Sequence, residues 1–407
     1  MPFDYSALFR PGLPPPAARW GGFPRYNFVG GHNDAANVPV AEFIAAAESV
    51  LSREGRTLAT YGLESGPQGY RPLREFLAAS LEARTGMRQT ADEVLIVSGS
   101  LQALDLVNAV LVAPGDAVIV EEATYQGTIT RLNRLSARVI PAPLDGGGIR
   151  MDALAAILDG LKAEGVAPKY IYTVPTVQNP TGTVMPENRR HELLRLARAH
   201  GVPVFEDDCY AELTFSGDRP RSIRALDDGS GQVIYCGSFS KTIAPALRIG
   251  YLVADWPVLS RMLPMKTDAG TGALEQMVLA EYCAAHFDDH VAALRAVLKE
   301  KCDAMVEALS AEFGASASFA APAGGIFIWV TLPEEVDTWR LFEAAQAEGV
   351  AINPGIEWTV DPALGRNRLR LCFGHPTPQV IHEGVALLAE ICHREFGVPV
   401  RGANRER

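Results

Sequence analysis

The segment GSFSKTIAPALRIG (237–250) lies between two apolar runs, VIYCGS (233–238) and RIGYLVA (248–254), that are typical of buried strands. Helical stretches separate several similar runs that occur earlier in the chain. These earlier runs are VLIVSG (94–99), AVIVEE (117–122), YIYTVP (170–175) and PVFEDD (203–208). Strands that alternate with helices predict an α/β fold with a mainly parallel sheet and helices on both of its faces.

A second, smaller α/β unit is expected towards the C-terminus. Long helical stretches run from about Leu274 to Phe313, and the apolar runs IFIWVTL (326–332) and LRLCF (369–373) follow them. The first 40 or so residues are rich in Pro, Gly and aromatic residues, which predicts an irregular arm. We therefore expect an arm with part of the small domain over residues 1–45, a large domain over 46–270 and a small domain over 271–407.

The polar residues of the segment 237–250 stand in an otherwise apolar setting. Most lysines lie on the surface, but Lys241 follows a buried strand and comes directly after Ser238 and Ser240, whose hydroxyl groups can bind a phosphate. The planar fork of Arg248 can hold the same phosphate. A lysine in such a cationic, desolvated position has a lowered pKa and can form an imine. The segment therefore predicts a catalytic lysine beside a phosphate site.

Polar residues also follow the other predicted strands, and chemistry in open α/β sheets gathers at the carboxyl ends of strands. In SGSLQ (98–102), a turn of small residues leads into a helix, which leaves free N–H groups at the helix start. Gly99 and Ser100 therefore form either a tight turn with a serine cap or an anion site that the helix dipole favours.

In FEDDCYAEL (205–213), Asp207 stands at a strand end and Tyr210 follows three residues later. A carboxylate in this place can keep a pyridine nitrogen protonated, which makes the ring an electron sink. A nearby tyrosine can hydrogen-bond the phenolate oxygen of such a ring. Adjacent aspartates are more often metal ligands or helix caps, but we expect no metal because the sequence supplies no matching His or Glu.

Three further residues complete the candidate site. Asn179, in the turn PTVQNPTG (175–182), can donate to the same phenolate oxygen. Tyr125, in ATYQG (123–127), either stacks on a ring-shaped cofactor or is a core tyrosine. Arg370 lies inside an apolar strand and needs an anion to justify its burial, and a substrate carboxylate would serve.

The composition argues against several classes of protein. The net charge of −11 and a pI near 5.3 argue against nucleic-acid binding, which needs a basic face for phosphates. No apolar run approaches the ~20 residues that cross a bilayer, and we see no signal peptide at the N-terminus. The six cysteines form no CxxC pair, which favours reduced core cysteines. We expect a cytoplasmic protein.

Taken in order, these motifs resemble those of the fold-type I pyridoxal-phosphate enzymes, and specifically the class I and II aminotransferases. The motifs are YGLESGPQGYRPLR, SGSLQAL, ATYQG, QNPTG, EDDCY, GSFSK, LRIGY, GGIFIW and NRLRLCF. They extend from about Tyr61 to the C-terminus, and the subgroup most similar in look is the 2-aminoadipate aminotransferase type. The resemblance implies a large domain with a mainly parallel, seven-stranded type of sheet, a smaller α/β C-terminal domain, and a homodimer with shared active sites.

The resemblance also implies a role for each candidate residue. Lys241 would form the imine with pyridoxal 5′-phosphate and move a proton between the Cα of an amino acid and the cofactor. Asp207 would pair with the pyridinium nitrogen, and Arg370 would bind the substrate α-carboxylate. The other cofactor contacts would come from Gly99, Ser100, the backbone of Leu101, Tyr125, Asn179, Tyr210, Ser238, Ser240, Arg248 and, from the neighbouring subunit, Tyr70. The reaction would move the amino group of an amino acid to a 2-oxo acid.

The N-terminal arm departs from the pattern of that subgroup. It reads YNFVGGHNDAANVPV (26–40), where the subgroup shows a GGLP-like run after a helical Ile-Arg segment that grips acidic side chains. A lone histidine is more often structural, yet His32 is our candidate for a specificity residue. Gly31 and Asn179 are also expected beside the substrate. Position 101 is Leu where the subgroup tends to carry Gln, which is tolerable if only the backbone N–H is used.

Two alternatives stay open at the level of sequence. Fold-type I enzymes also catalyse eliminations, decarboxylations and oxidations with the same lysine, so the protein could be a lyase, a decarboxylase or an oxidase. The second alternative is a regulator whose aminotransferase-like domain only senses the cofactor. Such regulators carry an N-terminal DNA-binding domain with a basic balance, which the Pro- and Gly-rich arm does not resemble.

Overall fold

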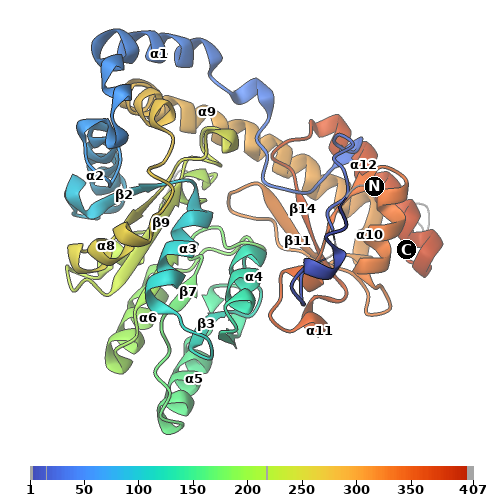
Figure 1. Cartoon of the computed structure of the whole chain (residues 1–407). Helices are drawn as coiled ribbons and strands as arrows, with labels where there is room; N and C mark the ends of the chain where they lie inside the picture. The colour runs from blue at the N-terminus through green and yellow to red at the C-terminus, as the bar shows by residue number, and fades with distance from the viewer. Residues whose placement is uncertain (1–2, 15, 217–218, 401–407) are drawn as a thin grey trace.

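The computed structural model describes residues 3–14, 16–216 and 219–400, which form a larger and a smaller part (Figure 1). One long helix, α9 (Ala273–Phe313), runs along both parts. Its first half contributes Met277 and Val291 to the core of the larger part. Its second half contributes Met305 and Phe313 to the core of the smaller part. The domain boundaries expected from the sequence stay a prediction, because α9 belongs to both cores.

The larger part is built on a seven-stranded sheet with the order β2-β10-β9-β8-β7-β3-β4. The strands from β9 to β4 run parallel, and β10 is antiparallel to both of its neighbours. The bounds are β2 (Val94–Val97), β3 (Ala117–Glu121), β4 (Arg138–Ala142), β7 (Ile171–Thr173), β8 (Val204–Asp207), β9 (Val233–Ser238) and β10 (Gly250–Val253). Apart from the edge strand β4, every residue of these strands is buried, which explains the continuous apolar runs in the sequence.

Helices pack on both faces of this sheet, as the sequence predicts. On β3, Val118 and Val120 join one core cluster with residues of α3 (Ser100–Leu111), whereas Ile119 joins another with residues of α5 and α6. The remaining helices of the larger part are α1 (Val40–Glu54), α2 (Arg71–Thr85), α4 (Gln126–Arg134), α5 (Met151–Ala163), α6 (Glu187–His200), α7 (Ile223–Leu226) and α8 (Trp256–Met262). A small hairpin, β5 (Leu144–Asp145) and β6 (Gly148–Ile149), follows β4.

Glycines cap the C-terminal ends of two helices in the larger part. Helix α2 ends at Gly86 with φ 71°, and α6 ends at Gly201 with φ 65°. Both residues adopt the left-handed conformation, which costs glycine little because it has no Cβ.

The smaller part contains a three-stranded antiparallel sheet with the order β11-β14-β13. Its elements are β11 (Phe327–Thr331), β13 (Asn353–Pro354), β14 (Arg368–Cys372), α10 (Thr338–Ala347), α11 (Pro362–Gly365) and α12 (Pro378–Phe396). The N-terminal arm joins this part, because β1 (Tyr26–Asn27) pairs in parallel with β12 (Val350–Ala351). The expected α/β fold, with a large mainly parallel sheet and a smaller second unit, is confirmed.

All six cysteines are buried and free of disulfides. Across the described ranges, no helix is both long enough and apolar enough to cross a membrane.

A buried carboxylate holds together two loops at the carboxyl edge of the larger sheet. Glu121, at the end of β3, accepts hydrogen bonds from Thr173 Oγ1 (2.7 Å) and the Val174 N–H (3.0 Å) through Oε1. Its Oε2 accepts from Gln178 Nε2 (2.7 Å) and Thr124 Oγ1 (3.1 Å). Burial nevertheless raises the pKa of Glu121 to about 7, because the four hydrogen bonds do not offset the loss of water.

This raised pKa predicts a pH-dependent stability. Because the folded-state pKa lies above the ordinary value of 4.5, ionisation favours the unfolded chain as pH rises from 4.5 to about 7. The substitution Glu121→Gln removes this titration. We expect the unfolding free energy of the wild type, minus that of Glu121→Gln, to fall by about 3 kcal/mol between pH 5 and pH 8 in urea titrations. The exposed Glu390→Gln serves as control, and a difference that stays level with pH would contradict the account.

Candidate active site

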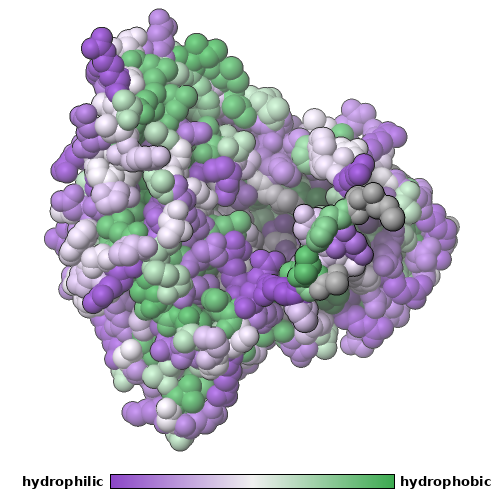
Figure 2. Space-filling view, viewed as in Figure 1, coloured by the Kyte–Doolittle hydropathy of each residue, from purple (hydrophilic) through white to green (hydrophobic). Residues whose placement is uncertain are grey.

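A cavity of about 300 Å³ lies between the carboxyl edge of the larger sheet and the smaller part, where Figure 2 shows a hollow in the molecule. Most of the residues predicted for the site line this cavity. They are Gly31, Ser100, Leu101, Tyr125, Asn179, Asp207, Tyr210, Ser238, Ser240, Lys241, Arg248 and Arg370. Segments far apart in the sequence therefore converge on one space, because the carboxyl ends of parallel strands meet at one edge of the sheet.

Lys241 follows β9, and its side chain reaches across to the N-terminal arm. Its Nζ donates a hydrogen bond to the carbonyl oxygen of Gly31 at 2.9 Å. A β-carbon on residue 31 would collide with this amine, so a larger residue there would displace the Lys241 side chain. Burial lowers the pKa of Lys241, and the positive charges of Arg370 and Arg248 lower it further. The cavity therefore holds an amine that loses its proton more easily than an ordinary lysine.

One end of the cavity offers donors for an anion. Helix α3 begins at Ser100, and Gly99 before it has φ 80°. A β-carbon on Gly250 of β10 would come within 2.9 Å of the Ser100 nitrogen, so glycine there lets the helix start lie against the strand. Arg248 NH2 donates to the Ser98 carbonyl at 3.2 Å, which places the guanidinium beside Gly99. Free N–H groups and a guanidinium at a helix start could hold a phosphate.

A carboxylate without a cation marks the bottom of the cavity. Asp207, at the end of β8, is 6% exposed, and its Oδ2 accepts a hydrogen bond from the Tyr172 hydroxyl at 2.7 Å. Burial raises the pKa of Asp207, because no described side chain forms an ion pair with it. A protonated ring nitrogen placed here would supply the missing positive charge.

A guanidinium without a carboxylate marks the side formed by the smaller part. Arg370 of β14 donates through NH1 to Asn179 Oδ1 (2.9 Å) and through NH2 to the Gly30 carbonyl (3.2 Å). The Trp358 ring centroid lies 3.7 Å from its Cζ, a cation–π contact. Arg370 is 4% exposed, and its Nε has no hydrogen-bond partner in the described chain. An anionic ligand would complete this environment.

Asn179 links this arginine to Tyr210. Its Nδ2 donates to the Tyr210 hydroxyl at 3.3 Å, while its Oδ1 accepts from Arg370. The Tyr125 ring also lines the cavity, with its centroid 6.2 Å from that of Trp358. The backbone N–H of Thr124 donates to the Trp358 carbonyl at 2.8 Å, so the loop that carries Tyr125 is tied to the smaller part.

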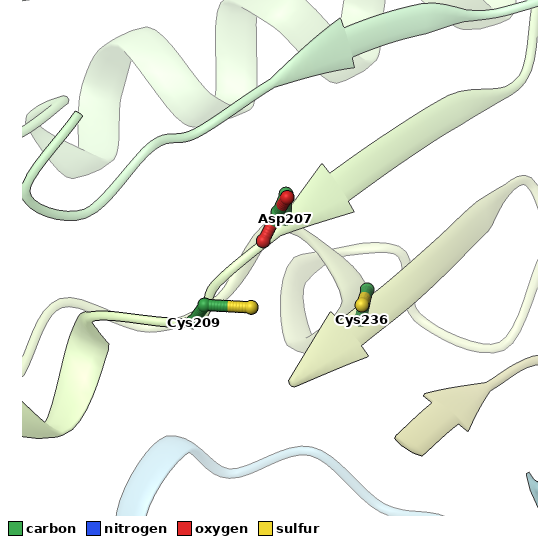
Figure 3. A group of neighbouring side chains, drawn as sticks. All are labelled: Asp207, Cys209 and Cys236. Atoms are coloured by element: carbon green, nitrogen blue, oxygen red, sulfur yellow. The ribbon is translucent and has the colours of Figure 1, made fainter. Parts of the chain in front are cut away.

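Asp207 also belongs to a group of possible metal ligands (Figure 3). Its carboxylate and the thiols of Cys209 and Cys236 lie within 4.8 Å of one another. Metal ions bind thiolates, but a hydrogen bond with Cys236 and burial raise the pKa of the Cys209 thiol well above its ordinary value. The protonated thiols therefore form part of the buried wall around Asp207.

Three predicted residues lie outside the wall of the cavity. Gly99 stands directly behind Ser100 and contacts Arg248. His32 packs with Phe23 and His375, at ring-centroid distances of 5.2 and 6.2 Å. Tyr70 is buried elsewhere, beside a second cavity of about 840 Å³, and its hydroxyl donates to Glu54 Oε1 at 2.6 Å.

The cavity wall also includes residues that the sequence analysis missed, namely Gly30, Gln126, Val174, Cys209, Asn353 and Trp358. The last two come from the smaller part and carry no recognisable motif. Gln126 could have been predicted, because it directly follows Tyr125 in the motif ATYQG.

Comparison with known proteins agrees with this geometry. The family model described as aminotransferase class I and II matches residues 30–388. Aromatic-amino-acid aminotransferase 1 of Thermococcus litoralis is 34% identical over 91% of this chain and 88% of its own. The structure of LysN, an α-aminoadipate aminotransferase from Thermus thermophilus solved with N-(5′-phosphopyridoxyl)-L-leucine, is 33% identical with a TM-score of 0.84, covering 92% of this chain and 93% of that one.

Regulatory proteins also share this sequence pattern. An uncharacterised HTH-type transcriptional regulator of Bacillus subtilis is 32% identical over 81% of this chain and 66% of its own length. The family match and the aminotransferase relatives nevertheless confirm the expected activity and cofactor. This chain belongs to the class I and II aminotransferases, the pyridoxal-phosphate enzymes that move the amino group of an amino acid to a 2-oxo acid.

Proposed function

We propose that Lys241 holds the cofactor and carries the proton during transamination. The observation that supports this most directly is the set of unpaired charges: Lys241, Asp207 and Arg370 surround one cavity, and no described residue forms an ion pair with any of them. Burying such charges is costly unless a partner arrives. A ring nitrogen and an α-carboxylate carry the charges that complement Asp207 and Arg370.

The residues at the cavity ends fit pyridoxal phosphate. Arg248, Ser100 and the first N–H groups of α3 form a cradle of donors for the phosphate, with Ser238 and Ser240 beside it. Asp207 stands where a pyridinium would offset its buried charge. The Tyr125 ring provides an aromatic wall between these ends.

When bound, pyridoxal phosphate supplies an aldehyde that captures amines and a protonated ring that accepts the electron pair of the Cα–H bond. Asp207 would keep the proton on the ring nitrogen, while Asn179 Nδ2 and the Tyr210 hydroxyl would hold the phenolate oxygen. Arg370 would bind the substrate α-carboxylate. Lys241 would act as the general base for the substrate Cα proton, and its lowered pKa favours the neutral amine that this role needs.

We further propose a homodimer in which Tyr70 reaches the phosphate site of the partner subunit. Tyr70 does not line the cavity of its own chain but lies beside the second cavity, whose wall includes the exposed apolar side chains Leu58 and Tyr61. Tyr61 is 90% exposed, and Met265 and Leu274 close by are also exposed. Apolar surface around a buried tyrosine favours an interface between two copies of the chain.

We also propose that the enzyme is cytoplasmic and binds no nucleic acid. The net charge of −11 supports the second point, because phosphate backbones repel an acidic surface.

The role of Lys241 is tested by absorbance. Wild-type protein reconstituted with pyridoxal phosphate should show a visible band that borohydride abolishes, and Lys241→Ala should lack the band and lose transamination by at least about 10³-fold. The exposed Lys162→Ala should behave as wild type. An unchanged band in Lys241→Ala would refute the assignment.

Shared active sites are tested by mixing two inactive dimers. Lys241→Ala and Tyr70→Ala subunits are refolded or co-expressed together. Random pairing makes half of the dimers mixed, each with one intact site, so activity should recover to about a quarter of the wild-type value. No recovery on mixing, or full activity of Tyr70→Ala alone, would rule out the shared site.

His32 remains our candidate for a specificity residue. Burial and the neighbouring His375 and Lys241 lower the pKa of His32, so the ring is neutral near pH 7. We expect His32→Ala to change the preference among amino acids while leaving the cofactor absorbance unchanged. An equal loss for every amino acid would count against a side-chain role.

A further inference from the structure

The smaller part supplies one wall of the cavity, and Asn353 on this wall has no part in the function proposed above. Asn353 of β13 pairs with Arg370 of β14 in antiparallel register. Residues directly opposite on antiparallel strands project from the same face, with their β-carbons about 5 Å apart. Asn353, Arg370 and Trp358 therefore form one wall, and all three line the cavity.

This wall has donors without acceptors. Three buried nitrogens lack a hydrogen-bond partner among the described residues: Asn353 Nδ2, Trp358 Nε1 and Arg370 Nε. These three nitrogens have almost no solvent-accessible surface. A buried donor without an acceptor is costly, and these donors gain an acceptor only when a side chain rotates.

A half-turn of the Asn353 amide would relieve part of this cost. Rotation about χ2 exchanges the amide nitrogen and oxygen, which places an acceptor at the buried position of Nδ2, on the residue that pairs with Arg370. The same rotation turns the NH2 group of Asn353 from the protein interior to the cavity. Asn353 then orients Arg370 on one side and offers a donor to a ligand on the other.

We propose that Asn353 is a specificity-determining residue, which donates a hydrogen bond from its amide to a neutral oxygen on the side chain of the amino-acid substrate. This inference rests on the proposed function, in which Arg370 takes the α-carboxylate. Amino acids with a carboxamide or keto oxygen in the side chain are the substrate class that fits.

The charges of the cavity decide between a neutral and an anionic acceptor. Its described cationic side chains are Lys241, Arg248 and Arg370. Lys241 reacts with the cofactor, the phosphate uses Arg248 and the α-carboxylate uses Arg370, so no cation remains for a second carboxylate. Arg25 of the arm does not change this, because it is largely exposed and pairs with Glu383 on the surface. A carboxylate in the side chain would be desolvated without a partner.

The test measures single-turnover rates of the holoenzyme with glutamine, norleucine, glutamate and phenylalanine, followed by the change in cofactor absorbance without a 2-oxo acid. The variants are Asn353→Leu, which removes both amide functions, and Asn353→Asp, which keeps an acceptor beside Arg370 but removes the donor. We expect each to lower the glutamine-to-norleucine rate ratio by about tenfold, because one net hydrogen bond is lost.

Control variants and the wild-type spectra distinguish a failure of this inference from a failure of the proposed function. Asn133→Leu and Asn133→Asp, on the exposed surface of α4, should leave the ratio unchanged. The inference would be overturned by an unchanged ratio in both Asn353 variants or by an equal loss of rate for all amino acids. It would also be overturned if the wild type reacted faster with glutamate than with glutamine, or used norleucine or phenylalanine but not glutamine. A wild type whose absorbance responds to no amino acid would instead overturn the proposed function.

Discussion

The site depends on buried charges that the protein leaves unpaired. Lys241, Asp207 and Arg370 lie at the carboxyl edge of the larger sheet, and none of them forms an ion pair within the described chain. Taking single charges out of water costs several kcal/mol each, which the fold tolerates because hydrogen bonds hold every one in place. A cofactor and a substrate with complementary charges would complete the arrangement, so the same groups that cost stability when unpaired would provide the binding.

The two parts of the chain hold these charges at a fixed separation. Arg370 comes from the smaller part but donates to Asn179 of the larger, and the N–H of Thr124 reaches the Trp358 carbonyl. The N-terminal arm adds a third connection, since its Gly31 carbonyl accepts from Lys241. Contacts between the two parts and the arm therefore hold the side chains of Arg370 and Lys241 on the same cavity.

The fold and the larger half of the site could be predicted from sequence, because each polar group follows an apolar strand and parallel strands end at one edge. Asp207, Asn179 and Lys241 are found in this way. Trp358 and Asn353 could not be found, since they reach the cavity only through the register of the smaller sheet. His32 packs with aromatic side chains beside the cavity, a contact set by how the arm crosses the smaller part.

The central claim is that Lys241 carries the cofactor. It is tested most directly by finding which lysine is covalently bonded to the cofactor. The holoenzyme is reduced with borohydride, digested and analysed by mass spectrometry for the phosphopyridoxyl group. The account predicts one modified peptide, from the segment 237–250, with the added mass on Lys241. A stable adduct on any other lysine, with Lys241 unmodified, would contradict it.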